Sequence, residues 1–187
     1  MKKIIVLLMI MFLLFSMAGC KKQGGNNNTN TNNSTGEKKE DPKEIIPEGN
    51  AQTFTKDDMT ITLTKDFSEK AKDDTQAYYE SARAILFCYQ DTNEALKGAK
   101  LDPATLNLKD YAKRVIEVYN IKAEVVEKEG MFIFEFYDSG SGYEFYRMGA
   151  VQKGTNSFWV FEFVCEKKDE AEYSGQFLKW AKSITIK

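Results

Sequence analysis

The segment MFIFEFYDSGSGYEFYRMGAVQKGTNSFWVFEFVC, residues 131–165, decides the fold of this chain. Its aromatic and β-branched residues form three runs, which predict strands over Met131–Tyr137, Tyr143–Gln152 and Ser157–Glu166. The stretches between them, Asp138–Gly142 and Lys153–Asn156, are rich in Gly, Ser, Asp and Asn, as hairpin turns are. The segment therefore predicts an antiparallel meander.

The third run is apolar on both faces of its strand. Trp159, Phe161 and Phe163 fall on one face, and Phe158 and Val160 fall on the other. A strand that is apolar on both faces is normally covered on both sides. We therefore expect this strand near the centre of a sheet, with helices packed over it.

The rest of the chain predicts further strands and helices around the meander. Strands are expected at Thr53–Thr55, Met59–Thr64, from Lys122–Glu127 onward, and at Ser183–Lys187. Gln76–Glu80 and Arg83–Gln90 are expected to form two strands or one long bent strand. Helices are expected at Leu108–Tyr119, after an Asn107 N-cap, and at Asp169–Lys182, and Thr92–Lys100 is expected to be a short helix or a turn. This order predicts an α+β fold, with a central, mainly antiparallel sheet flanked by helices on both faces.

Composition narrows the chemistry that the chain can do. The 187 residues include no histidine, which excludes Ser-His-Asp and Cys-His nucleophiles and zinc sites with His ligands. Cys20, Cys88 and Cys165 form no CxxC pair, so no zinc ribbon or thioredoxin-type motif is available. The formal net charge of −2 gives no bulk attraction for nucleic acid. We predict no cofactor, no catalytic residue and no nucleic-acid partner.

The N-terminus has the pattern of an export signal. Lys2 and Lys3 precede the apolar run Ile4–Phe15, which is shorter than the roughly twenty residues that a membrane-spanning helix needs. The following Met17-Ala18-Gly19-Cys20 resembles the lipobox of bacterial lipoproteins, with Met17 at the position that is usually Leu. The resemblance implies cleavage before Cys20 and a diacylglycerol on its thiol, which anchors a chain to a membrane. The alternative is an ordinary signal peptide or an uncleaved anchor.

We divide the chain into a signal peptide at residues 1–19, a tether at residues 20–50 and a globular domain at residues 51–187. Asn26–Ser34 is almost entirely Asn and Thr, and Thr35–Glu44 is charged. Segments of such low hydrophobicity cannot offset the entropy cost of ordering, so the tether is expected to be disordered. Lys21 and the Asn-rich tether suit the outer face of a Gram-positive cell membrane.

The order of elements in residues 53–187 resembles the PsbP-like fold, which is named for extrinsic subunits of photosystem II and is shared by small bacterial lipoproteins. The resemblance is carried by Ile61–Phe67, the helix Leu108–Tyr119, the strand Phe158–Cys165, the helix through Phe177 and Trp180, and Ser183-Ile184. It implies an α/β/α sandwich. It implies no site residue, because the family has no shared catalytic motif and its members act mostly as non-enzymatic binding or assembly factors.

Three glutamates of the meander are candidates for a site. Glu135, Glu144 and Glu162 lie one on each predicted strand. If they share a face, they could bind a hard cation such as Ca²⁺, and a pair of them could do acid–base chemistry. The alternative is a solvated or ion-paired patch with Arg147 and Lys153 nearby.

Cysteines and tyrosines supply two further candidates. Cys88 and Cys165 lie in predicted strands and are expected to be buried thiols, with a disulfide as the alternative. Tyr137, Tyr143 and Tyr146 gather near the turns of the meander, where large amphipathic side chains suit a surface that binds a partner. Packing under the helices is an equal alternative for the tyrosines.

These observations favour a membrane-anchored extracytoplasmic lipoprotein whose domain binds a protein or a small molecule without catalysing a reaction. One alternative is a hydrolase or transferase at the cell surface that uses the three glutamates. The other is a structural spacer on the cell surface.

Overall fold

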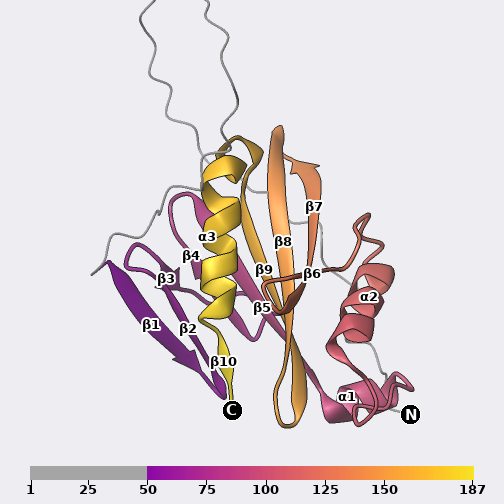
Figure 1. The fold of residues 1–187 in the computed structure, drawn as a ribbon. Helices are drawn as coiled ribbons and strands as arrows, with labels where there is room; N and C mark the ends of the chain where they lie inside the picture. Colours follow the sequence, from indigo (N-terminus) through magenta and orange to yellow (C-terminus); the bar gives the residue numbers. More distant parts are fainter. Residues whose placement is uncertain (1–49) are drawn as a thin grey trace, which may run out of the picture.

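The computed structural model describes residues 50–187, and Figure 1 shows their arrangement. The predicted signal peptide, Cys20 and all of the predicted tether except Asn50 lie outside the described residues. The strands are β1 (Ala51–Lys56), β2 (Met59–Thr64), β3 (Ser68–Glu69), β4 (Ala77–Glu80), β5 (Ala84–Thr92), β6 (Val126–Lys128), β7 (Met131–Gly140), β8 (Tyr143–Lys153), β9 (Ser157–Glu166) and β10 (Thr185–Ile186). The helices are α1 (Asn93–Gly98), α2 (Leu108–Val118), the 3-10 turn η1 (Lys167–Asp169) and α3 (Glu170–Lys182). Among residues 50–187, no helix is long and apolar enough to cross a membrane.

The predicted meander is confirmed and forms the middle of the larger sheet. This sheet has seven antiparallel strands in the order β3-β4-β5-β9-β8-β7-β6. The β7–β8 hairpin is tighter than predicted, because β7 runs on to Gly140 and pairs it with Tyr143. Only Ser141 and Gly142 form the turn, and both have positive φ angles, of 53° and 84°. A two-residue turn of this kind matches the twist of the strands that it joins.

A second, smaller sheet was not predicted. The β1–β2 hairpin and the C-terminal strand β10 form a three-stranded sheet with β2 in the middle. The side chains of Met59, Ile61 and Leu63 all point from β2 into the core. The hairpin therefore stacks over one face of the larger sheet instead of extending its edge.

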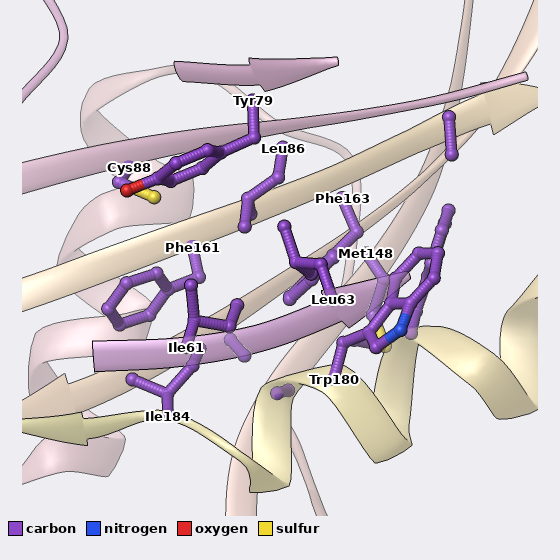
Figure 2. Packing of buried hydrophobic residues seen from close by; sticks show 14 of the residues in the cluster. Ile61, Leu63, Tyr79, Leu86, Cys88, Met148, Phe161, Phe163, Trp180 and Ile184 are labelled. Carbon is purple, nitrogen blue, oxygen red and sulfur yellow. The ribbon is translucent and has the colours of Figure 1, made fainter. Parts of the chain in front are cut away.

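The face under the small sheet, which we call the α3 side, carries the larger core cluster (Figure 2). Alternate residues of β9, such as Phe161 and Phe163, meet Ile61 and Leu63 of β2 and Trp180 of α3 there. Figure 2 also shows Tyr79, Leu86 and Cys88 completing this cluster from β4 and β5. The small sheet and α3 together cover the α3 side of the large sheet.

The opposite face, the α2 side, carries a second core cluster. Phe158 and Val160 of β9 pack there with Tyr111 and Val115 of α2 and with Leu96 of α1. Helix α2 begins as predicted, since the Asn107 side chain accepts a hydrogen bond from the Asp110 N–H at 2.9 Å. Helices therefore lie on both faces of the large sheet, which confirms the predicted fold class.

The strand before the meander is shorter than predicted. Only Val126–Lys128 is strand, although the pattern placed its start at Lys122. Ile121, Ala123 and Val125 instead pack against the α2-side cluster, which takes the chain away from β7. As a result β6 covers only the first three residues of β7, Met131–Ile133.

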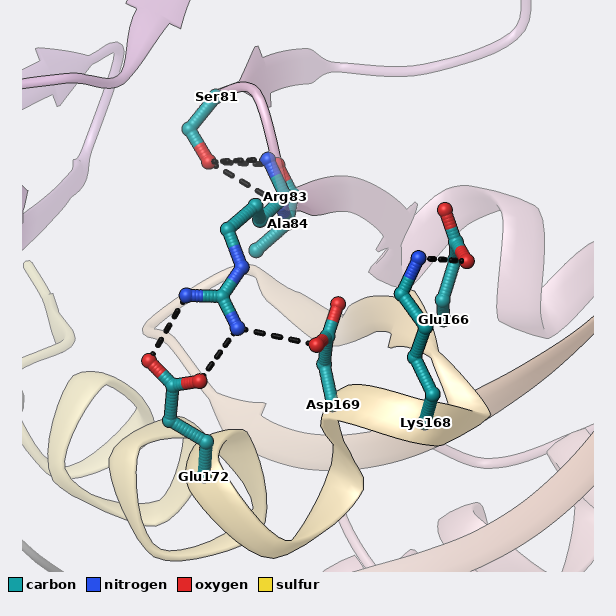
Figure 3. Close-up of polar contacts among 7 residues, drawn as sticks. All are labelled: Ser81, Arg83, Ala84, Glu166, Lys168, Asp169 and Glu172. Carbon is teal, nitrogen blue, oxygen red and sulfur yellow. Dashed lines mark hydrogen bonds and ion pairs between the residues drawn. The ribbon is translucent and has the colours of Figure 1, made fainter. Parts of the chain in front are cut away.

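An exposed ion-pair group joins the start of α3 to the β4–β5 turn (Figure 3). Arg83 donates to Glu172 Oε1 at 2.9 Å and to Asp169 Oδ1 at 3.0 Å. Ser81 Oγ accepts hydrogen bonds from the backbone N–H groups of Arg83 and Ala84, which hold the turn. These contacts fix the direction in which α3 leaves the sheet, although exposed ion pairs contribute little to stability.

Gly149 provides a test of the packing on the α2 side. It pairs with Phe134, and a Cβ atom at this position would lie 2.1 Å from the Phe134 Cζ. The Phe134 ring is buried and stacks on Phe136, so it has little room to move. We expect Gly149→Ala to lower the free energy of unfolding by about 1–3 kcal/mol, measured by urea unfolding. Gly140→Ala is the matched control, because no atom lies within 4 Å of its added Cβ. Equal stabilities of the two variants would contradict this account.

Candidate functional site

The three predicted surface tyrosines do not form one surface. Tyr137 and Tyr143 are exposed, at 55% and 54%, but Tyr146 is only 2% exposed. Tyr146 packs its ring against Phe177 of α3, with the ring centroids 5.9 Å apart. Of the two alternatives that the sequence left open, Tyr146 therefore follows the second and packs under a helix, so it does not belong to the predicted surface. Because Tyr143 and Tyr146 are three residues apart on one strand, they point to opposite faces, and Tyr137 lies on the α3 side with its pairing partner Tyr146.

Tyr137 is exposed but held in place. Its hydroxyl donates to Glu170 Oε1 at 2.8 Å, and this hydrogen bond raises the pKa of the phenol. Lys167 Nζ lies 5.2 Å from the centre of its ring, and the centre of the Tyr146 ring lies 5.9 Å from it. An ordered aromatic side chain at the surface loses little entropy when a partner covers it, which favours binding.

The three predicted glutamates do not converge. Glu135 and Glu144 lie on the α3 side, whereas Glu162 lies on the α2 side, because the pairing register separates them. Glu135 accepts a hydrogen bond from the Tyr146 hydroxyl at 2.5 Å, and Glu144 pairs with Lys167 at 3.2 Å. Within residues 50–187, no group of three or more Asp, Glu, Cys or His side chains is placed to hold a metal ion. The hypothesis of a shared cation site or acid–base pair is therefore wrong.

Glu162 belongs instead to a buried ion-pair group on the α2 side. It is 7% exposed and accepts a hydrogen bond from Arg147 Nη1 at 2.6 Å. Arg147 Nε also lies 2.9 Å from Asp138 Oδ2. Burial raises the pKa of Glu162, and the ion pair with Arg147 opposes that rise. The predicted alternative of an ion-paired patch was right for Arg147, but Asp138 was assigned only to a turn.

This group has no reacting partner. Tyr89 lies close enough to Glu162 for its pKa to be raised by the carboxylate, after the larger effect of its own burial. Arg147 pairs with both Glu162 and Asp138, so its guanidinium already serves two carboxylates, and no hydroxyl or thiol hydrogen-bonds to the Glu162 carboxylate among the described residues. We therefore interpret the group as a polar contact that fixes the register of β7, β8 and β9.

The cysteines are buried thiols, as predicted. Cys88 pairs with Phe161 and Cys165 pairs with Ala84, so the two residues are four positions apart along neighbouring strands. That offset is about 13 Å, which is too far for a disulfide. Burial raises the pKa of Cys165 to about 12 and that of Cys88 further. Neither thiol is therefore a nucleophile near neutral pH.

A shallow hollow of about 510 Å³ lies beside the β3–β4 hairpin. Its walls include Lys56, Glu69, Lys70, Lys72 and Asp73. Lys56 and Glu69 pair with each other at 3.3 Å across it. Sites for small molecules are usually apolar and enclosed, so this charged and open hollow does not favour a small-molecule ligand.

The backbone edge of β7 is the most distinctive surface of the domain. The first residue of β6, Val126, pairs with Ile133, so the outer side of Phe134–Gly140 has no neighbouring strand (Figure 1). Among the strands of residues 50–187, only β8 pairs with this stretch, on its other side. We call these seven residues the open edge. Exposed strand edges are usually blunted by Pro, by charged side chains or by a bulge. The open edge contains no Pro or Lys, and its two acids, Glu135 and Asp138, are held by Tyr146 and Arg147.

The directions of the backbone groups follow from the hairpin. Gly140 and Tyr143 flank a two-residue turn and therefore form a hydrogen-bonded pair. Every second residue then bonds to β8, and those between point outward. The outward N–H and C=O groups belong to Glu135, Tyr137 and Ser139. The sequence predicted β7 and singled out Tyr137, but it did not predict the open edge. The strand before β7 was expected to start at Lys122, and a strand of that length would have covered more of β7.

Comparison with known proteins supports the fold. No protein-family model and no curated protein sequence matches this chain. Among solved structures, the solution structure of cyanobacterial PsbP (CyanoP) from Synechocystis sp. PCC 6803 aligns with a TM-score of 0.55 at 11% identity, covering 77% of this chain and 96% of that one. The chain therefore has a PsbP-like fold, as predicted.

Two other solved structures are similar at a lower level. A crystal structure from Bacteroides thetaiotaomicron gives a TM-score of 0.48 at 9% identity and covers 75% of this chain but 49% of that one. The structure of LpqN, described as involved in cell envelope biogenesis of Mycobacterium tuberculosis, gives 0.38 at 8% identity, with coverages of 68% and 82%.

Arg147→Met tests the buried ion-pair group. Removing the guanidinium leaves Glu162 buried without its counter-ion, which is expected to cost about 3–5 kcal/mol of unfolding free energy at pH 7. The folded-state pKa of Glu162 then lies well above its unfolded value of about 4.3. Stability from such a raised pKa is fully present below the unfolded value and is lost as pH rises through the folded value. The variant should therefore be less destabilised at pH 4.5 than at pH 7, measured by urea unfolding.

The double variant Arg147→Met/Glu162→Leu is the control for this test. It removes both charges and should recover much of the stability at pH 7. A loss for Arg147→Met that is the same at both pH values would contradict a buried Glu162 carboxylate.

Proposed function

We propose that this chain is a lipid-anchored extracytoplasmic protein whose domain binds a partner protein through the open edge of β7, without catalysing a reaction. The observation that carries the proposal is the seven-residue backbone edge Phe134–Gly140, which contains the ordered and exposed Tyr137 at its centre. Extended segments commonly bind such edges by adding a strand, with the main chain providing affinity and side chains providing specificity.

The anchoring part of the proposal rests on the N-terminal sequence. A short cationic segment, a twelve-residue apolar run and Met17-Ala18-Gly19-Cys20 form the pattern of a lipoprotein signal. Two acyl chains on Cys20 provide the stable attachment that a single chain does not. The chain that follows would then place the domain outside the cell.

The two alternatives have less support. A hydrolase or transferase that uses Glu135, Glu144 and Glu162 needs at least two of these carboxylates in one cleft, and Glu162 is separated from the other two by the sheet. A purely structural spacer gives no reason for an unprotected strand edge, since such edges are a liability in a protein that has no partner.

Cys20→Ala tests the anchor. Without the thiol no diacylglycerol can be attached, so the protein should either appear in the soluble fraction or accumulate with its signal uncleaved. Fractionation of cells and the mass of the mature chain measure both outcomes. Ser16→Ala is a control outside the four-residue motif and should be processed normally. Normal processing and full membrane retention of the Cys20→Ala variant would refute the lipobox.

Ser139→Pro tests the edge. Proline removes the outward N–H of residue 139, which β8 does not use, so the domain should stay folded while strand addition is blocked. We expect cross-linking on intact cells, followed by affinity capture, to recover at least about 10-fold less partner with this variant.

Thr53→Pro is the matched control, because it removes an outward N–H from the edge strand β1 of the small sheet. It should leave capture of the partner unchanged. Thermal unfolding of both variants checks that they are folded. Equal recovery of the partner with Ser139→Pro and the unmodified protein would exclude the open edge as the binding surface.

A further inference from the structure

We infer that the partner at the open edge is a second copy of this chain, which pairs its β7 with the first in antiparallel fashion. This inference rests on the proposed function and specifies the partner. A two-fold axis through Tyr137, perpendicular to the sheet, relates the two copies. The two seven-stranded sheets then form one continuous sheet across the interface.

The length of the open edge fits this pairing. It begins after Ile133, the last residue of β7 that β6 covers, and stops at Gly140, before the turn. Its central residue is Tyr137. An antiparallel pairing centred there sets Phe134 opposite Gly140 and Glu135 opposite Ser139, which uses all seven residues of both copies. A strand longer than this would collide with β6, so the site suits a short strand of matched length.

The outward N–H and C=O groups of the open edge lie at the positions that the two-fold pairing brings opposite each other. In an antiparallel pair, hydrogen bonds form between residues whose N–H and C=O groups point toward the other strand. Glu135, Tyr137 and Ser139 are the residues that point outward on the open edge. The two-fold pairing matches Tyr137 with Tyr137 and Glu135 with Ser139, so every outward group meets an outward group of the second copy. A shift of one residue would pair outward groups with inward ones and lose these bonds.

The side chains are compatible with the pairing. Paired residues share a face, so the two Tyr137 rings, each 55% exposed, lie beside each other on the α3 side. Glu135 faces an uncharged serine, and the two Glu135 residues are four positions apart along the strands, about 13 Å. Asp138 faces Phe136, so no like charges are directly opposed, and the two Asp138 side chains, which are diagonal neighbours, are each paired with Arg147 of their own copy. Val126, which is 42% exposed at the start of β6, lies where the Ser141-Gly142 turn of the second copy arrives.

The geometry also agrees with attachment to a membrane. A two-fold axis perpendicular to the sheet keeps the α3 sides of both copies on the same side of the joined sheet. The small sheet lies on that side, and its first strand β1 follows directly from Asn50. Both chains therefore enter their domains from one side, as two chains anchored in the same membrane require.

Disulfide trapping in the full chain on intact cells tests the axis. Residues of a hydrogen-bonded antiparallel pair have Cα atoms about 5.5 Å apart, within the range that a disulfide spans. Tyr137→Cys should therefore give a product of twice the chain mass on mild oxidation. Cys88 and Cys165 do not compete, because both are buried. Tyr143→Cys is the matched control, because Tyr143 is as exposed as Tyr137. In the proposed dimer the two residues at position 143 lie on the order of 25 Å apart, too far for a disulfide.

A mixed experiment tests the register. Glu135→Cys alone and Ser139→Cys alone should not cross-link, whereas cells that carry both variants should give a mixed dimer. Self-cross-linking of Tyr143→Cys to the same extent as Tyr137→Cys would show random collision and overturn the inference.

A second experiment at position 137 shows whether a failure concerns only the second copy or also the proposed binding surface. A photoreactive residue at position 137 reports any protein that lies on the open edge. If Tyr137→Cys stays monomeric while the photoreactive residue captures a different protein, the second copy is excluded and the proposed function holds. If neither cross-link forms, both the inference and the binding surface are refuted.

Discussion

The burial of both faces of β9 is the constraint on which the rest of the structure depends. Residues Ser157–Cys165 are all buried, so this one strand needs apolar cover on two sides. On one side the cover comes from α3 and the small sheet, and on the other from α1 and α2. The helices and the N-terminal hairpin can therefore be understood as layers required by a single strand.

The same constraint limits where function can lie. Both faces of the central strands are occupied, and the one charged side chain in the middle of β9, Glu162, is neutralised by Arg147. The faces therefore provide stability and register, while the unsatisfied hydrogen-bonding groups of the sheet collect at its margin. Binding through main-chain groups is the natural use of such a margin, because it needs no pocket and no catalytic side chain.

Sequence reasoning succeeded where one strand or helix decides the answer and failed where two must be aligned. The run of apolar residues on both faces of β9 and the Asn107 N-cap are local patterns, and the strand and the helix start that they predict are both confirmed. The glutamates and tyrosines depended on the register between strands, which alternation alone does not fix. The sequence could not choose between surface and core for Tyr146, because its burial comes from Phe177, which is 31 residues later in the chain. The start of β6 was predicted too early because Ile121, Ala123 and Val125 suit either a strand or packing under a helix.

The small sheet joins the two ends of the domain. Its middle strand, β2, is bounded on one side by β1 and on the other by β10, and the Lys187 N–H donates to the Asp58 C=O at 3.0 Å. Contacts between residues so far apart in sequence form late, because the chain between them must first be brought together. The layer that covers the α3 side of β9 is thus incomplete until Thr185 and Ile186 have paired with β2. If the chain is exported unfolded, as the proposed anchoring requires, this arrangement would delay closure of the domain until its first and last strands have met.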